Sequence, residues 1–263
     1  MQAHDVVFDF NISSYSSLMA FIANNNQIYI WDNISNQIFT ELSYNGQRWK
    51  DISINADGKI IAGQSESGDL HIWQEIEKGS YRYFQTIDTE KTISAIALDH
   101  SGEYLAVGED TSAISIDIWD IKNEFFLKQN LRYVHTESNN LFSLESLDFH
   151  PTHSDTLVSL SCQAIIASQL SNCQILLWDT DRSEPFLPAL IERLTYIPFH
   201  QDRNLGRKSN GLISFSPDGS QLWYKDPYPI LSELNLYEEP TLFNAPISTF
   251  ELSSNGKWLL AKR

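Results

Sequence analysis

Several residue types and patterns are scarce in this chain. No run of 18 apolar residues occurs, which excludes a membrane-spanning helix. The first residues, Met1 to Asp5, carry neither a basic nor an apolar region, so we expect no secretory signal peptide. Two cysteines, Cys162 and Cys173, are too few for a disulfide framework. We expect both to be reduced thiols in a cytoplasmic protein.

Basic residues are also scarce. The 263 residues include 18 Lys and Arg against 34 Asp and Glu, a net charge of −16 at pH 7. Such a surface repels phosphate groups, so we expect neither nucleic acid nor a membrane as a partner. Three bases, Arg203, Arg207 and Lys208, nevertheless gather between Gln201 and Gly211. This segment either contacts an acidic partner or is a solvated insertion.

The sequence motifs of common enzymes are absent. No Gly-x-Ser-x-Gly elbow, phosphate-binding loop, dinucleotide fingerprint or calcium loop occurs. His150 and His153 form the one close histidine pair, but metal sites usually need three or four ligands. We interpret this pair as part of a turn, and His100 as a turn residue facing solvent on the outer rim. The sequence therefore predicts no enzyme activity, no cofactor and no metal.

A repeated β-strand pattern fills the chain. The clearest unit alternates apolar and polar residues from Asp51 to Ile54, turns at Asp57-Gly58 and continues from Lys59 to Gly63. After a second turn it closes at Leu70 to Trp73. Alternation of period two, broken by Gly-containing turns, predicts an antiparallel β-meander.

Tryptophan marks the end of most units. Trp-Asp closes units at residues 31, 119 and 178, with a degenerate Trp-Gln at residue 73, so these marks lie 42, 46 and 59 residues apart. In the fifth unit Leu234-Asn235 stands where Trp-Asp is expected. Each unit is too small to bury its own apolar face, so the units must stack on one another.

These residues resemble the WD40 repeat family. The matches are the Trp-Asp closures, Leu147 to Pro151, Phe215 to Gly219, Ala62-Gly63 and Ala106 to Gly108. The resemblance implies a single all-β domain over residues 1–263, a WD40-type propeller with about five complete four-stranded blades and a half blade, within a seven-bladed ring. We expect the blades at about 5–45, 46–90, 91–134, 140–190, 208–244 and, in part, 247–263. The family's Gly-His pair is absent, so we expect its buried Asp-His-Ser-Trp network to be incomplete and the blades to be held mainly by apolar packing.

The resemblance also implies a function. Its usual partner-binding face consists of the connections between blades and the turns between second and third strands. We therefore expect a non-catalytic scaffold that binds a protein or peptide, with Arg48, Trp49, Arg203, Arg207 and Lys208 as candidate contacts. For Trp49 the alternative is a packed first-strand residue. Two other functions stay open: a sensor region of a larger NTPase- or protease-linked protein, and an enzyme with a propeller body.

The last unit contains only two strands, from Phe250 to Ala261. An open pair of inner strands would be a template for pairing with another chain. Either the sequence is a segment of a longer polypeptide that supplies the missing strands, or a partner donates them. We expect that the sequence is a segment of a longer polypeptide.

Overall fold

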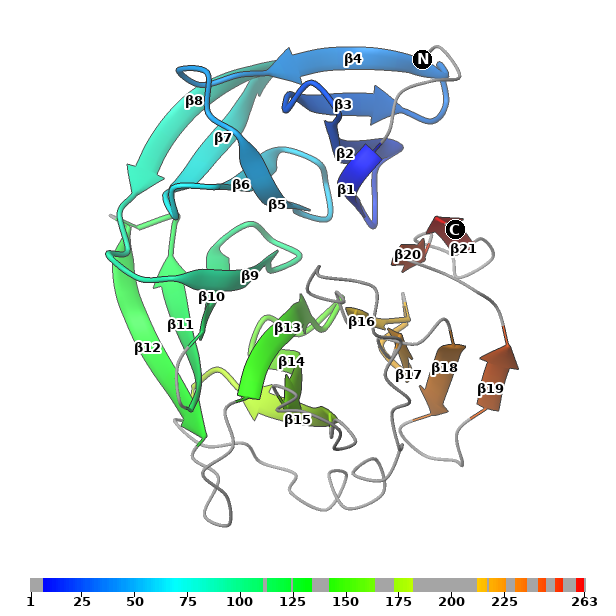
Figure 1. The fold of residues 1–263 in the computed structure, drawn as a ribbon. Helices are drawn as coiled ribbons and strands as arrows, with labels where there is room; N and C mark the ends of the chain where they lie inside the picture. Colours follow the sequence, from blue (N-terminus) through cyan, green and yellow to red (C-terminus); the bar gives the residue numbers. More distant parts are fainter. Residues whose placement is uncertain are drawn as a thin grey trace.

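The structure, a computed structural model, describes residues 7–110, 113–123, 125–133, 142–163, 173–181, 212–216, 218–225, 230–235, 241–244, 249–252 and 259–262. In these ranges every regular element is a β-strand. The strands form small antiparallel sheets arranged in a ring, with the first strand of each sheet toward the centre (Figure 1).

Each sheet follows the chain order, and each lies within one of the ranges expected for a blade. The first sheet contains β1 (Val7–Ile12), β2 (Leu18–Ala23), β3 (Ile28–Asp32) and β4 (Gln37–Leu42). The second contains β5 (Trp49–Ile54), β6 (Ile60–Ser65), β7 (Leu70–Glu77) and β8 (Ser80–Ile87). The third contains β9 (Ile93–Leu98), β10 (Tyr104–Asp110), β11 (Ile114–Asp120) and β12 (Phe126–Tyr133).

The remaining sheets are less complete in the part of the chain that is described. The fourth has three strands, β13 (Phe142–Phe149), β14 (Thr156–Gln163) and β15 (Cys173–Asp179). The fifth has four, β16 (Leu212–Phe215), β17 (Gln221–Lys225), β18 (Ile230–Asn235) and β19 (Thr241–Asn244). The sixth has two, β20 (Thr249–Leu252) and β21 (Leu259–Lys262). The all-β propeller fold expected from the sequence is confirmed at this level.

The apolar core lies between neighbouring sheets rather than within one. In one cluster Ile28 and Ile30 of the first sheet pack with Ile52 and Trp73 of the second. Similar clusters fill the spaces between the second and third, third and fourth, and fourth and fifth sheets. This is the arrangement expected when one unit cannot bury its apolar face alone.

The turn between the first and second strands ends in a glycine that touches the preceding sheet. Gly58, Gly102 and Gly219 all have positive φ, at 78°, 72° and 72°. A Cβ on Gly58 would lie 2.8 Å from Ser16 Oγ, and one on Gly102 would lie 2.8 Å from Asn55 Nδ2. Glycine is therefore required here both by the backbone conformation and by the close approach of the preceding sheet.

The tryptophans that close the repeats belong to the core to different degrees. Trp73 and Trp178 are fully buried, whereas Trp31 and Trp119 are half-buried. Trp178 Nε1 donates a hydrogen bond to Ser159 Oγ at 2.9 Å. The fourth sheet thus contains the Ser-Trp hydrogen bond of the network that the resemblance implied. The prediction that this network is incomplete concerns its histidine, because the family's Gly-His pair is absent from the sequence.

In the third sheet an ion network occupies the corresponding region. Lys91, just before β9, donates to Asp117 Oδ2 at 2.7 Å and to the Glu109 carboxylate. Asn130 Nδ2 donates to the other Asp117 oxygen at 2.6 Å. The Glu109 and Asp117 side chains are buried, so these bonds compensate carboxylates removed from water. This sheet is therefore stabilised by ion pairs and hydrogen bonds in addition to the apolar packing expected from the sequence.

The cysteines differ from the expectation of reduced thiols. The backbones of Cys162 in β14 and Cys173 in β15 are directly opposite one another in the ladder. Cys162 is disulfide-bonded, and Cys173 is the one other cysteine of the sequence. The expectation of two reduced thiols is therefore wrong, because strand pairing brings together two residues that are 11 positions apart.

Candidate functional site

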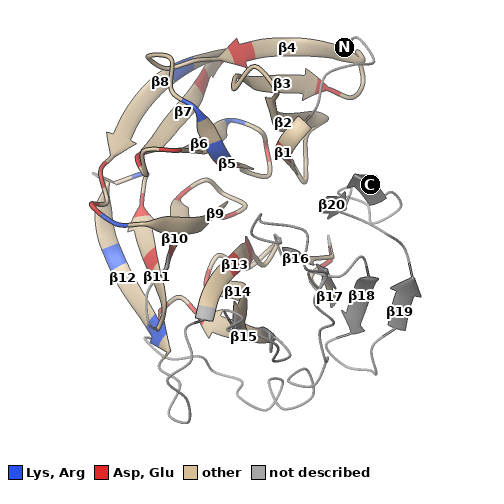
Figure 2. Cartoon of the chain, in the orientation of Figure 1, with Lys and Arg blue, Asp and Glu red and all other residues tan. Residues whose placement is uncertain are grey.

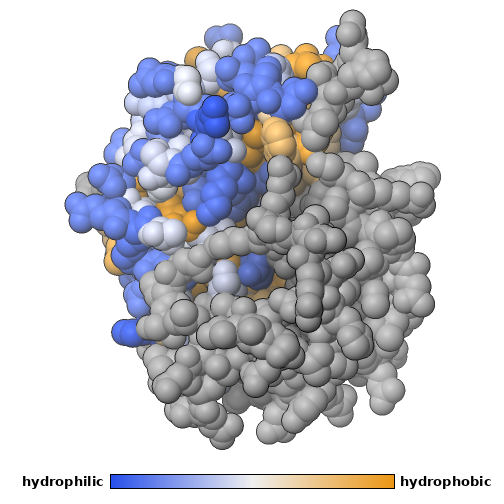
Figure 3. All heavy atoms as spheres, in the orientation of Figure 1, coloured by the Kyte–Doolittle hydropathy of each residue, from blue (hydrophilic) through white to orange (hydrophobic). Residues whose placement is uncertain are grey.

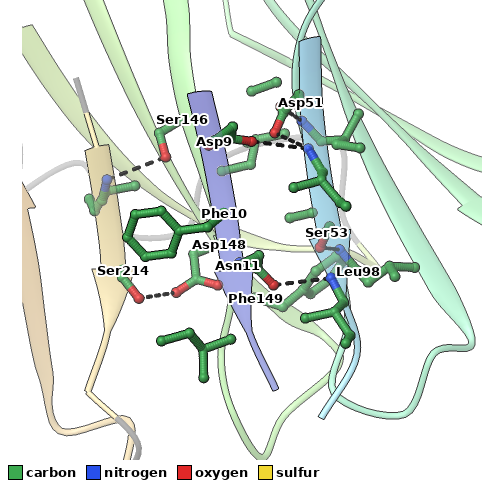
Figure 4. A pocket seen from close by; sticks show the side chains of 18 of the residues that line it. Asp9, Phe10, Asn11, Asp51, Ser53, Leu98, Ser146, Asp148, Phe149 and Ser214 are labelled. Atoms are coloured by element: carbon green, nitrogen blue, oxygen red, sulfur yellow. Dashed lines mark hydrogen bonds between the residues drawn. The ribbon is translucent and has the colours of Figure 1, made fainter. Parts of the chain in front are cut away.

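The first strands of five sheets line a cavity of about 730 Å³ at the centre of the ring (Figure 4). At one end, which we call the entry mouth, the inner strands begin. It is lined by Phe8, Asn26, Lys50, Glu66, Ser94 and Glu145. At the other end, which we call the turn mouth, the inner strands lead into their turns. It is lined by Ser14, Ala56, His100 and Pro151.

Polar side chains on the cavity wall join one inner strand to the next. Asn11 Oδ1 accepts a hydrogen bond from the Ile54 N–H at 3.0 Å, and Asp9 Oδ2 accepts one from the Ile52 N–H at 3.1 Å. These N–H groups lie at the inner edge of the second sheet, where no further strand pairs with them. The side chains of β1 thus satisfy backbone donors of β5.

The second and third sheets are joined in the same way. Ser53 Oγ accepts from the Leu98 N–H at 2.9 Å, and Asp51 Oδ2 accepts from the Ile96 N–H at 3.0 Å (Figure 4). The acceptors again stand two residues apart on the inner strand, as Asp9 and Asn11 do in the first. This spacing was present in the sequence and was the signal by which these residues could have been found.

The fourth and fifth sheets repeat the arrangement. Asp148 Oδ2 accepts from the Phe215 N–H at 2.7 Å and from the Ser214 hydroxyl at 3.0 Å. Ser146 Oγ accepts from the Ile213 N–H at 3.3 Å. These contacts connect strands more than 60 residues apart in sequence, across a segment that lies outside the described residues.

Between the inner strands of the third and fourth sheets the contact is apolar instead. Ala95 and Ala97 occupy the two acceptor positions on β9 and are buried. Leu144 of β13 lies over Gly108 of β10, where an added Cβ would be 1.8 Å from Leu144 Cδ2. Small residues on the third sheet therefore let the fourth pack closely against it at the positions where the other junctions have hydrogen bonds.

Two of the joining carboxyls have raised pKa values. Burial raises the pKa of Asp148 to about 7, against the hydrogen bonds from Phe215 and Ser214, which lower it. Burial also raises the pKa of Asp51, which is hydrogen-bonded to the Asp9 carboxyl. Two carboxyls can share such a bond only if one of them holds a proton. The side chains of Asp51 and Asp148 both line the cavity and are partly exposed, so solvent reduces the effect of burial on their pKa values.

The entry mouth combines an exposed aromatic ring with charges of both signs. Phe8 is 51% exposed, and Glu66 lies at the same end. Lys50 Nζ donates to the Ile93 carbonyl at 2.6 Å, which holds its ammonium group beside the third sheet. Arg48 is exposed in the connection just before β5, and basic residues are visible on and beside this strand (Figure 2).

The other predicted contacts have different positions. Trp49 is only 5% exposed and lies against His71 and Trp73, with ring centroids 5.2 Å away in each case. It therefore has the packed first-strand position that was the alternative to partner contact, although its edge reaches the cavity. Arg203, Arg207 and Lys208 lie outside the described residues. Partner binding by all five candidates stays a prediction.

At the turn mouth, hydrogen bonds connect the turns of successive sheets. The Tyr15 N–H donates to the Ala56 carbonyl at 2.7 Å, and the Ala56 N–H donates to the His100 carbonyl at 3.2 Å. Tyr15 also donates through its hydroxyl to the Pro151 carbonyl at 3.5 Å. His100 is a turn residue, as predicted, but it lines the cavity rather than the outer rim. His100 directly follows β9, an inner strand that lines the cavity, which explains the difference.

Among the described residues no group of three or more His, Cys, Asp and Glu side chains is arranged to hold a metal ion. No helix in that part of the chain is long and apolar enough to cross a membrane. On the face in Figure 3, hydrophilic residues cover most of the described sheets, and apolar residues show mainly in the hollows between them.

These features define the class of protein as an all-β propeller with a polar central cavity. No protein-family model matches the chain, and no curated protein is similar enough to count as a relative.

Proposed function

We propose that the chain is a WD40-type propeller module, part of a seven-bladed ring, that binds a protein or peptide segment over its entry mouth and has no catalytic activity. The observation that carries this proposal is the entry mouth itself. Phe8 offers apolar surface there, at the same end of the cavity as Lys50 and the carboxylates of Glu66 and Glu145. An exposed aromatic ring with charges around it is the composition of many protein-binding sites.

The bonding of the cavity carboxyls supports a non-catalytic role. Asp9, Asp51 and Asp148 each accept a backbone N–H from the next sheet. A carboxyl that performs acid–base chemistry must exchange protons with a substrate. In this ring these groups instead stabilise the junctions between sheets, so the burial and raised pKa values of Asp51 and Asp148 have a structural explanation.

A cytoplasmic location is part of the proposal, and one observation opposes it. The disulfide at Cys162 is unusual for a reducing compartment, where protein thiols are kept free. The state of this cysteine in the isolated protein is therefore also a test of the compartment.

Selection from a displayed peptide library tests the binding proposal without a known partner. The chain is immobilised, enriched peptides are synthesised, and their affinities are measured by calorimetry. We expect the combined Phe8→Ala and Lys50→Glu variant to weaken binding by at least about tenfold, because apolar contact and charge are lost together. The control is Ile34→Ala in the turn between β3 and β4, where the side chain is 85% exposed and lies outside the entry mouth.

Two outcomes would contradict the proposal. One is a failure to enrich any peptide that binds the folded chain. The other is equal affinity of the selected peptides for the wild type and the combined variant, which would place binding on another surface. Hydrolysis of a substrate panel by the purified chain would refute the non-catalytic part.

A further inference from the structure

His150 bridges the fourth and fifth sheets at the turn mouth. It follows β13, and its ring packs edge-on against Phe215 with centroids 5.0 Å apart. Its Nε2 lies against Gly219, where an added Cβ would be only 2.0 Å away. A backbone hydrogen bond with Gly219 favours the protonated form of the ring.

The second nitrogen of the same ring accepts a hydrogen bond. The Thr152 N–H donates to His150 Nδ1 at 3.3 Å, and His153 Nδ1 lies 3.0 Å from it. A backbone N–H can only donate, so His150 Nδ1 has no proton. Both nitrogens of a charged imidazole carry protons, so the contact at Nδ1 fits only the neutral ring, which holds its proton on Nε2.

His100, in the neighbouring turn, behaves differently. Its Nδ1 lies 3.3 Å from Ser154 Oγ, and that hydroxyl donates its one hydrogen to Asp99 Oδ2 at 2.7 Å. His100 Nδ1 must therefore be the donor in this contact. It keeps that proton whether the ring is neutral or charged, so protonation of His100 does not disturb the contact.

The charged groups around His150 come from three turns. Its own turn contributes His153 and Asp155, the turn after β9 contributes Asp99 and His100, and the turn after β16 contributes Asp218. Burial lowers the pKa of His150, and His153 lowers it further. The bond to Gly219 and the charge of Asp155 oppose this change without reversing it.

We propose that His150 is a proton-sensitive contact that loosens the junction between the fourth and fifth sheets in mildly acidic solution. A proton added at Nδ1 is repelled by the Thr152 N–H and crowds the His153 ring. The charged imidazole therefore has to rotate away from Thr152 and His153. The ring then leaves Gly219 and Phe215, which are its contacts with the fifth sheet.

The direction of the pH effect follows from the lowered pKa. The unfolded chain binds the proton at a higher pH than the folded chain, so the contribution of neutral His150 is fully present above about pH 6.5. It is lost as the pH falls through the lower, folded value. Asp148 is also protonated over this range, and because its pKa is raised by burial this protonation stabilises the same junction and opposes the loosening caused by His150.

The test follows the protein from pH 7.5 to pH 5 in buffers with a metal chelator. Proton NMR of the histidine Cε1–H groups measures each pKa, and amide exchange, corrected for intrinsic rates, measures opening around Ser216 and Gly219. We expect His150 to titrate below pH 6.5 and exchange there to increase by about tenfold as it becomes charged. Exchange in the first and second sheets is expected to change far less.

Two variants separate the proposal from general acid sensitivity. His150→Gln keeps an N–H donor near Gly219 but does not titrate, so the pH-dependent exchange should disappear. His100→Gln is the control and should retain it. The proposal is overturned if His150 titrates at or above pH 6.5, or if exchange depends on pH equally in His150→Gln. The wild-type titration decides the matter alone if a variant does not fold.

Discussion

Asp148 of the fourth sheet accepts the backbone N–H of Phe215 in the fifth at 2.7 Å, across 67 residues of chain. Its pKa is raised to about 7 by burial, above its ordinary value of 3.8. Between pH 3.8 and about 7, Asp148 therefore holds its proton in the folded chain but has released it in the unfolded chain. Stability contributed by the protonated group is present below about pH 4 and is lost as the pH rises through about 7.

The Asp148→Asn variant tests this relationship. An Asn side chain offers the same carbonyl oxygen to Phe215 but carries no charge to desolvate. We expect the melting temperature of the variant to exceed that of the wild type by about 2–5 °C at pH 7.5, with the difference shrinking toward pH 5. The control is Asp155→Asn, an exposed carboxylate in the next turn. A difference that grows toward low pH would contradict the assignment.

The sequence predicted the elements that are set locally. Asp57-Gly58 and similar turns, together with alternating strands, fix the sheet boundaries because both act over a few residues. The joining side chains Asn11 and Asp51 were not found, since their partners belong to the next sheet and come within reach only when neighbouring sheets pack together. Lys91 was missed for the same reason: its carboxylate partners are 18 and 26 residues away.

Lys91 provides a second prediction. Lys91→Met removes the ammonium group that compensates Glu109 and Asp117, both of which are buried. Burial already raises the pKa of Glu109, and the loss of the cation should raise it further. We expect a loss of about 1–3 kcal/mol in the free energy of unfolding, measured by urea at pH 7.5, because Lys91 is itself partly exposed.

The matched comparison for Lys91 is an exposed ion pair. Lys59 Nζ lies 2.8 Å from Asp57 Oδ2 on the surface, where water and salt screen the pair, so Lys59→Met should change stability far less than Lys91→Met. Adding Glu109→Gln to Lys91→Met should recover part of the loss, since one buried charge is then removed. Equal effects of the two single lysine variants would show that burial does not strengthen the Lys91 network.

The disulfide at Cys162 predicts a defined pattern of alkylation. The protein, purified without reductant and unfolded in iodoacetamide, should gain no adduct in its intact mass. After reduction it should gain two, because the sequence contains two cysteines. Two adducts before reduction would instead support the free thiols expected from the sequence, and with them the cytoplasmic location.

Ser159 and Ser161 lie on the same strand, are both completely buried and differ in their hydrogen bonding. Ser159 Oγ accepts the indole N–H of Trp178 at 2.9 Å, whereas Ser161 Oγ has no hydrogen-bond partner among the described residues. Ser159→Ala would leave the Trp178 donor unsatisfied in the core, which costs about 1–3 kcal/mol. Ser161→Ala removes an unsatisfied hydroxyl, so its stability in urea should equal or exceed that of the wild type. Equal losses in the two variants would mean that cavity formation, and not the lost hydrogen bond, determines the cost at Ser159.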